Sequence, residues 1–184
     1  PAQLTYSSVV SCESVRIGFL IAAMYDLDPQ AADIGNAYLN ATTKEKYYII
    51  TGPEFGELER GKIALIVRAL YGLKSSGAMW RAHFAATLRD MDFTSSLADP
   101  DVWMRPEVRD DGYEYYGYVL LYVDDALVIN HDGMKALMEI NAHFKMKESS
   151  RSQSVITSCA NQWRWAKVLP HTFVLSTTLP ISVP

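Results

Sequence analysis

The segment Tyr118-Val-Leu-Leu-Tyr-Val-Asp-Asp-Ala-Leu-Val-Ile129 places two adjacent carboxylates, Asp124 and Asp125, between two runs of apolar residues. Valine, leucine, tyrosine and isoleucine at this density favour a pair of strands, and the acidic pair lies where the chain must turn between them. Neighbouring anions repel each other, so folding alone gives no reason for them. A magnesium ion would give one, because Mg²⁺ prefers oxygen ligands. Aspartate is also an ordinary turn residue, so this segment alone leaves both explanations open.

Helical and extended patterns alternate on both sides of this hairpin. Apolar residues at helical spacing predict helices over residues 11–25, with Ser11 or Ser14 as N-cap, from Ser75 or Ser76 to residue 88, and from Asp132 to residue 144. Extended patterns predict strands that lead into Asp33 and cover residues 47–50, 63–67, 102–104, 113–123 and 126–129, with a turn or short helix over 36–43. Helices packed on one face of a largely antiparallel sheet make an α+β domain, which is the fold class we expect.

The composition is that of a globular domain, with 184 residues of which 49% are hydrophobic and 21% charged. Cys12 and Cys159 are too few for a disulfide framework, and no apolar run reaches the roughly 18 residues of a membrane span. We therefore expect a reducing compartment and no membrane partner. The first residue is Pro1, so we expect the chain to begin inside a longer reading frame.

The net charge of −4 disfavours a broad nucleic-acid-binding face. One stretch, between positions 62 and 89, nevertheless concentrates basic residues. It fits either a local phosphate-binding patch or a solvated helix face. Its members are Lys62, Arg68, Lys74, Arg81 and Arg89.

A metal site for phosphoryl transfer needs carboxylates from separate segments, because one turn cannot surround two ions. Asp33 is the obvious second source, since it ends a predicted strand among small residues. If that strand lies beside the hairpin, Asp33, Asp124 and Asp125 converge at one edge of the sheet. Two cations about 3.5–4 Å apart would then bridge an attacking 3′-hydroxyl and a departing pyrophosphate.

Four short motifs occur in order: Asp33-Ile-Gly-Asn-Ala-Tyr38, Leu70-Tyr-Gly-Leu-Lys74, Ala98-Asp-Pro100 and Tyr122-Val-Asp-Asp125. Together they resemble the reverse transcriptase of copia-type (Ty1/copia) LTR retrotransposons, from about residue 5 to residue 147. The resemblance implies an RNA-directed DNA polymerase with a palm-like sheet and with fingers and thumb incomplete. It also implies an RNA or DNA template-primer, deoxynucleoside triphosphates, a Gag-Pol-type polyprotein with integrase and RNase H, and a cytoplasmic virus-like particle with nuclear entry of the element.

The resemblance assigns the metal site residue by residue. Asp33 and Asp124 match the shared ligands of two Mg²⁺ ions, for which Mn²⁺ can substitute, and Asp125 matches the neighbouring third catalytic carboxylate. Ile34 would offer its backbone carbonyl to the nucleotide-bound ion.

The same resemblance assigns a substrate side. Tyr38 matches the aromatic residue that excludes a 2′-hydroxyl, although a core aromatic is the alternative reading. Gly72 would let the backbone approach the template, Lys74 would contact phosphate, and Tyr122 would lie at the substrate beside the carboxylates. The family usually continues Lys-Gln-Ala-Pro after this lysine, whereas Ser75, Ser76 and Gly77 follow Lys74 here, which weakens any template-contacting glutamine.

Other features point to structure or lie outside the resemblance. Trp80 and Phe84 are expected to pack a helix on the sheet, and Asp99 with Pro100 to open a strand.

Residues 1–147 would form the reverse transcriptase unit, and residues 148–184 a poorly ordered, unrelated tail. We expect the isolated chain to be inactive. The alternatives are a non-catalytic remnant that keeps the palm fold as a nucleic-acid or protein-binding domain, and an unrelated scaffold whose Asp-Asp is only a turn.

Overall fold

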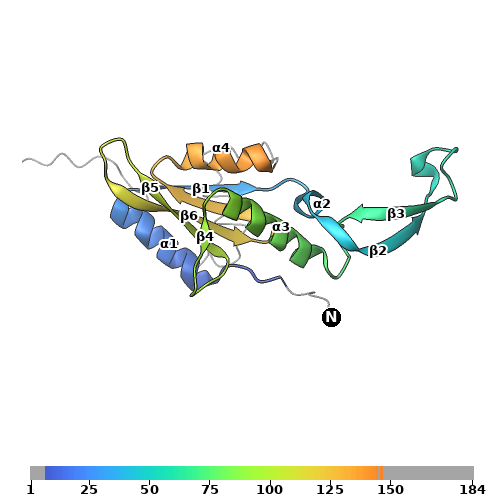
Figure 1. Ribbon diagram of the computed structural model, residues 1–184, viewed down its shortest axis with the longest axis horizontal. Coiled ribbons are helices and arrows are strands. Elements are labelled where there is room, and N and C mark those ends of the chain that lie inside the picture. Colours follow the sequence, from blue (N-terminus) through green and yellow to red (C-terminus); the bar gives the residue numbers. More distant parts are fainter. Residues whose placement is uncertain (1–6, 145, 147–184) are drawn as a thin grey trace, which may run out of the picture.

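The computed structural model describes residues 7–144 and residue 146 (Figure 1). The helices are α1 (Cys12–Tyr25), α2 (Ala37–Asn40), α3 (Ser76–Asp90) and α4 (Gly133–His143), with a 3₁₀ turn over Pro53–Phe55. The strands are β1 (Asp28–Asp33), β2 (Thr42–Ile50), β3 (Ile63–Arg68), β4 (Thr94–Ser95), β5 (Val102–Val108), β6 (Glu114–Tyr122) and β7 (Asp125–Asn130). Among these residues no helix is long and apolar enough to cross a bilayer.

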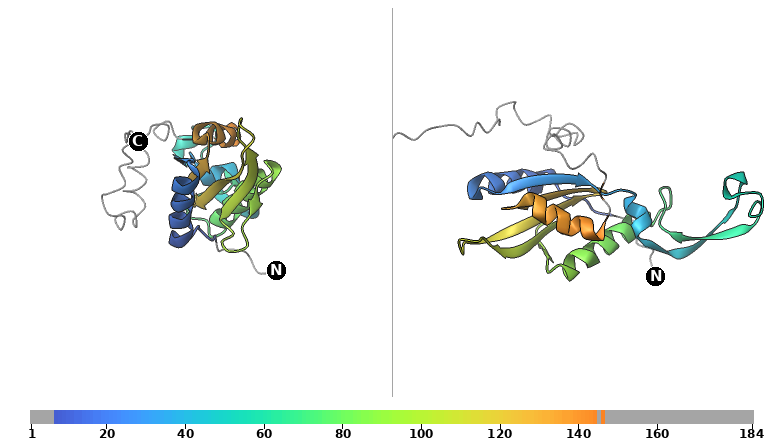
Figure 2. Two further views of the ribbon diagram at one scale, coloured as in Figure 1. Left: turned by 90° about the vertical axis from the view of Figure 1, so that its left-hand side faces the viewer. Right: turned by 90° about the horizontal axis from the view of Figure 1, so that it is seen from above.

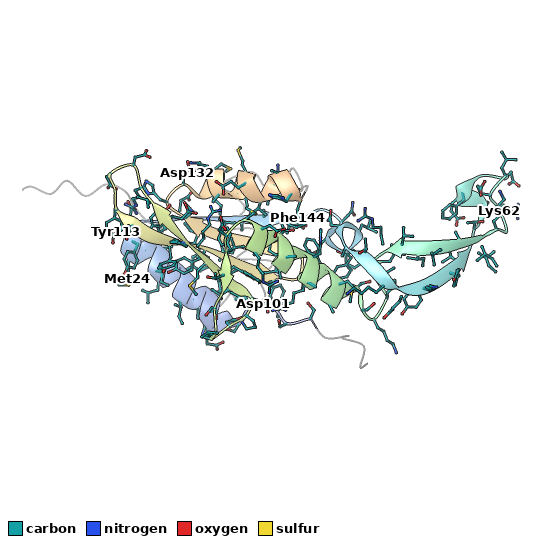
Figure 3. All side chains as sticks on the ribbon, in the orientation of Figure 1. Met24, Lys62, Asp101, Tyr113, Asp132 and Phe144 are labelled. Atoms are coloured by element: carbon teal, nitrogen blue, oxygen red, sulfur yellow. The ribbon has the colours of Figure 1, made fainter. Side chains whose placement is uncertain are left out.

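Five strands form one antiparallel sheet in the order β1-β7-β6-β5-β4, with β6 and β7 as the hairpin at its centre. Strands β2 and β3 form a separate two-stranded ribbon that projects from the body, with Lys62 near its far end (Figures 1 and 3). Mixed helices and antiparallel sheet confirm the α+β class.

Helices cover both faces of the five-stranded sheet, which corrects the expectation of one face (Figure 2). Helices α3 and α4 pack on the face that includes Val119 and Leu121, whereas α1 packs on the face of Leu120. The reason lies in the central strands, where residues 119–121 and 126–129 are buried consecutively. A strand with apolar side chains on both faces needs cover on both faces.

Helix α1 is fastened at both ends by charged residues that flank β5. At its start, Asp99 Oδ2 accepts hydrogen bonds from the Ser11 amide (2.9 Å) and the Ser14 hydroxyl (2.7 Å). At its end, Arg109 donates to the carbonyls of Tyr25 and Asp26. An anion at the N-terminus and a cation at the C-terminus both match the helix dipole. The role expected of Asp99 at the start of the strand is also seen, because the Val102 amide donates to the Asp99 carbonyl over 3.1 Å.

Several boundaries follow the sequence patterns closely. Ser11 caps α1 by accepting from the Ser14 amide, and Asp132 caps α4 by accepting from the Lys135 amide. The strand expected over 102–104 extends to Val108, and β4 has no counterpart in the sequence patterns. The predicted boundary at residue 147 and the predicted tail 148–184 lie outside the described residues.

Candidate metal and nucleotide site

Strand β1 lies directly beside β7, so Asp33 reaches the acidic hairpin. Asp33 and Asp125 are opposite each other in the antiparallel register, which directs their side chains to the same face of the sheet. One residue further on, the Ile34 amide donates to the Asp124 carbonyl over 2.8 Å. Carboxylates from two distant segments therefore lie at one edge of the sheet, which the sequence pattern predicted.

A two-residue turn holds Asp124 at the end of the β6–β7 hairpin. Tyr122 pairs with Asp125, which leaves Val123 and Asp124 as the turn residues. Val123 has φ 57°, in the left-handed region that a β-branched residue rarely adopts. The indole Nε1 of Trp80 donates to the Val123 carbonyl over 2.7 Å, and Trp80 itself is 1% exposed. A buried side chain of α3 therefore fixes the turn from the protein interior.

The carboxylates could form part of a metal-ligand set. Asp33, Asp124 and Asp125 are each half-buried, and Oδ1 of Asp33 is shielded from solvent. Within the described residues, no group of three or more His, Cys, Asp or Glu side chains is close enough to hold one ion. Like charges on adjacent strands repel, so a bound cation would favour closer approach of these side chains. The donor set fits Mg²⁺, which proteins usually hold through one or two carboxylates together with substrate phosphates.

Two tyrosines lie next to Asp124. The rings of Tyr38 and Tyr71 are stacked, with centroids 4.2 Å apart and planes at 30°. The Tyr71 hydroxyl donates to Oδ2 of Asp124 over 3.4 Å. Burial, followed by the negative charge of Asp124, raises the pKa of the Tyr38 phenol above its ordinary value. Tyr38 therefore lies near Asp124, through its stacking on Tyr71.

Tyr71 is the residue that the sequence analysis missed. It belongs to the motif Leu70-Tyr-Gly-Leu-Lys74, in which only Gly72 and Lys74 were assigned roles. Nothing in its spacing shows a contact with Asp124, which is 53 positions away in the chain. The available signal was a large aromatic side chain next to a turn glycine, in a segment predicted to face the nucleotide.

The remaining predicted residues lie around this centre at different depths. The Ile34 side chain is fully buried, and its backbone forms an isolated antiparallel bridge with Met146. Gly72 has φ 99° with open space beside its Cα, and Lys74 is exposed on the same loop. Tyr122 is 37% exposed and lies opposite Asp125 in the hairpin register.

The basic residues between positions 62 and 89 serve separate purposes. Lys62 pairs with Glu59 on the ribbon, and Arg68 donates to the Asn40 carbonyl. Arg81 pairs with the buried Asp101 at 2.6 Å, and Arg89 lies over the Trp103 ring. These four therefore do not form one phosphate-binding patch, nor one helix face.

Trp80 and Phe84 pack α3 against the sheet, which confirms their expected role. Both side chains are buried, and both contact Phe144, with ring centroids 5.2 Å apart in each case. Phe144 lies at the end of α4 (Figure 3). This aromatic cluster supports the turn that carries Asp124 through the Trp80 indole. Burial leaves neither ring available to stack on a base.

Comparisons with known proteins show the family of the chain. Residues 3–158 match the family described as reverse transcriptase (RNA-dependent DNA polymerase). The chain is 27% identical over 156 residues to a retrovirus-related Pol polyprotein from transposon TNT 1-94 of Nicotiana tabacum, an alignment covering 82% of this chain and 11% of that protein. It is 26% identical over 148 residues to a retrovirus-related Pol polyprotein from transposon RE2 of Arabidopsis thaliana, covering 78% of this chain and 10% of that protein.

A third similar protein is a retrovirus-related Pol polyprotein from transposon RE1 of Arabidopsis thaliana, 27% identical over 129 residues, covering 70% of this chain and 8% of that protein. The chain thus spans about a tenth of the length of these curated relatives. No solved structure matches it significantly.

Proposed function

Because this chain belongs to the reverse transcriptase (RNA-dependent DNA polymerase) family, we propose that its acidic hairpin is the catalytic end of a copia-type polymerase palm. The chain is then the reverse transcriptase part of a transposon Pol polyprotein. The observation that carries the proposal is the register of β1 on β7, which sets Asp33 opposite Asp125, next to the Ile34–Asp124 hydrogen bond.

The proposed reaction is attack of a primer 3′-hydroxyl on the α-phosphate of a deoxynucleoside triphosphate. Asp33 and Asp124 would hold two Mg²⁺ ions, or Mn²⁺ in their place, with Asp125 as the adjacent carboxylate and the Ile34 carbonyl at the nucleotide side. The ions would supply Lewis-acid stabilisation of the attacking and departing oxygens. The protein's own contribution is to fix Asp124, through Trp80 below and Ile34 beside it.

The substrate side of the proposal rests on the residues around Asp124. Tyr38 would exclude a 2′-hydroxyl by its bulk, which is a steric form of discrimination. Tyr122 ends β6 opposite Asp125, and Gly72 and Lys74 lie on the loop whose Tyr71 contacts Asp124. That loop would meet the template backbone and phosphates of an RNA or DNA template-primer.

The exposed ribbon β2–β3 supports the proposal that the isolated chain is inactive. Its cross-strand pairs Tyr48–Leu65 and Ile50–Ile63 put four large apolar side chains on one face, all of them exposed. An isolated two-stranded ribbon is marginally stable, and a large exposed apolar face marks a contact surface. Further parts of the polyprotein would cover this face and position the template, and catalysis depends on such positioning.

We also propose the context that the relatives suggest. Residues 1–147 would form the polymerase unit with the end of the fingers, and residues 148–184 would be a separate tail. The complete polyprotein would add integrase and RNase H and would act in a cytoplasmic virus-like particle, with nuclear entry of the element.

Metal-dependent nucleotide binding tests the site directly. Calorimetric titration of the 184-residue chain with a deoxynucleoside triphosphate should give binding that requires Mg²⁺ or Mn²⁺. Asp124→Asn should weaken it at least about tenfold, since it removes one of the charged metal ligands. Asp90→Asn, at an exposed position on α3, is the matched control and should leave binding unchanged.

Primer extension on a poly(rA) template tests the proposed inactivity. The 184-residue chain should give no robust incorporation, and a longer active chain should lose synthesis on Asp124→Asn with its fold intact. In the calorimetric titration, equal nucleotide binding by wild type and Asp124→Asn would contradict the metal site and favour a non-catalytic remnant.

A further inference from the structure

A tight turn presents Tyr71 to the acidic edge of the sheet. The Leu73 amide donates to the Leu70 carbonyl over 3.2 Å, which makes residues 70–73 a β-turn with Tyr71 and Gly72 at its centre. Gly72 has φ 99°, which the third position of a type II turn requires and glycine tolerates. The Ser76 hydroxyl also donates to the Leu70 carbonyl over 2.6 Å, which anchors the turn to the start of α3.

Tyr71 lies on the solvent side of Tyr38. Its side chain is 62% exposed, whereas Tyr38 is half-buried between Tyr71 and the body. The stacked rings cover one face of Tyr38, and the Tyr71 hydroxyl reaches Oδ2 of Asp124. One exposed side chain therefore covers both residues to which the proposed function gives a role in nucleotide selection and metal binding.

We propose that Tyr71 is a displaceable latch over this site, an inference that rests on the proposed polymerase function. Its hydroxyl occupies an acceptor position of Asp124, and its ring shields Tyr38, so both contacts give way when a divalent cation with its nucleotide binds. A cation coordinated by Oδ2 sits about 2.1 Å from that oxygen, where it competes with the Tyr71 hydroxyl. The hydrogen bond is long and the ring is exposed, so displacement costs little. Tyr71 is thus a positioning residue that sets metal and nucleotide affinity.

The alternative is that Tyr71 supports the metal as an outer ligand that orients Asp124. The two roles predict opposite signs. An outer-shell hydrogen bond strengthens metal binding, so its removal weakens affinity. A latch competes with the metal, so its removal strengthens affinity.

Titration of the 184-residue chain with Mn²⁺ decides between them, with free Mn²⁺ followed by electron paramagnetic resonance. Tyr71→Phe keeps the ring and removes the hydroxyl, and it should tighten Mn²⁺ binding about twofold to fivefold, a modest gain because the exposed 3.4 Å hydrogen bond that it removes is weak. Tyr71→Ala removes the ring as well and should also tighten binding of the Mn²⁺ complex of dATP. Tyr116→Phe is the control, because Tyr116 is an exposed tyrosine near the other end of β6 and should have no effect.

The outcomes distinguish failure of the latch alone from failure of the proposed metal site. If Asp124→Asn abolishes Mn²⁺ binding while Tyr71→Phe leaves it unchanged or weaker, the metal site stands and the latch is refuted. If Asp124→Asn binds Mn²⁺ as wild type does, or if wild type binds none, the metal site and the latch fail together. Circular dichroism of each variant confirms that the fold is kept.

Discussion

The hydrogen bond from Trp80 to Val123 predicts a specific loss of order at the acidic turn. Trp80→Phe keeps an aromatic ring in the cluster with Phe84 and Phe144 but removes the indole N–H that the Val123 carbonyl accepts over 2.7 Å. Loss of the hydrogen bond should cost about 1 kcal/mol of the free energy of unfolding. The smaller ring leaves part of its space unfilled, which should cost a further 1–2 kcal/mol or so, less than the cost of deleting a whole aromatic side chain.

The turn should respond more strongly than the global stability does. Val123 is held at φ 57°, and a β-branched residue in the left-handed region stores on the order of 1–3 kcal/mol. Without the indole donor, this strain favours opening of the turn. Amide hydrogen exchange is the suitable assay, because the Ile34 amide is bonded to the Asp124 carbonyl and reports on the turn from the neighbouring strand.

We expect Trp80→Phe to lower the free energy of unfolding by about 2–3 kcal/mol and to speed exchange at Ile34 by local opening. Phe84→Leu is the matched control, because it reduces the same buried cluster without touching the turn. That control should lower global stability while Ile34 exchange changes only with global unfolding. If both variants change Ile34 exchange by the same amount relative to global stability, the indole does not hold the turn, and the reasoning fails.

Two further predictions concern charged residues away from the turn. Burial alone would raise the pKa of Asp99, but hydrogen bonds from the Ser11 amide, the Ser14 hydroxyl and the Asp101 amide outweigh it and lower that pKa. The contribution of Asp99 to stability should therefore be complete above its unfolded pKa of about 4 and be lost as pH falls through the lower folded pKa. Asp99→Asn should make the free energy of unfolding less dependent on pH in this range. Arg81→Met should lower the free energy of unfolding in urea by about 3 kcal/mol, because it leaves the buried Asp101 carboxylate without its ion pair. The control Arg60→Met breaks the exposed pair with Glu57 and should lower it by less than about 1 kcal/mol. Equal losses would show that burial does not determine the strength of the Arg81 pair.

The parts of the fold that the sequence predicted are those with local signals. The hairpin around residues 118–129 follows from dense β-forming residues on both sides of a turn, and its strands appear within two residues of the expected limits. The caps at Ser11 and Asp132 follow from side chains that bond amides three residues away. In each case the deciding interaction lies within a few positions of the residue that makes it.

The features that sequence reasoning missed depend on contacts across the fold. The two ends of α1 are fastened over the second face of the sheet by Asp99 and Arg109, more than 80 residues away from the helix ends they bind. The two-residue strand β4 exists only because it pairs with β5. The contact of Tyr71 with Asp124 joins two loops that no periodic pattern relates. Such contacts become visible only when the register of the sheet is known.

The geometry of the acidic turn is fixed by backbone groups rather than by the carboxylates themselves. The Val123 carbonyl accepts from Trp80, and the Asp124 carbonyl accepts from Ile34, so both turn residues are held without their side chains. The carboxylates of Asp33 and Asp125 face each other across two strands, where like charges reduce stability. Replacing one carboxylate by an amide should therefore keep the geometry of the turn, which depends on these backbone bonds. Because backbone hydrogen bonds hold the turn, the proposed function predicts that Asp124→Asn loses metal affinity while the fold is kept.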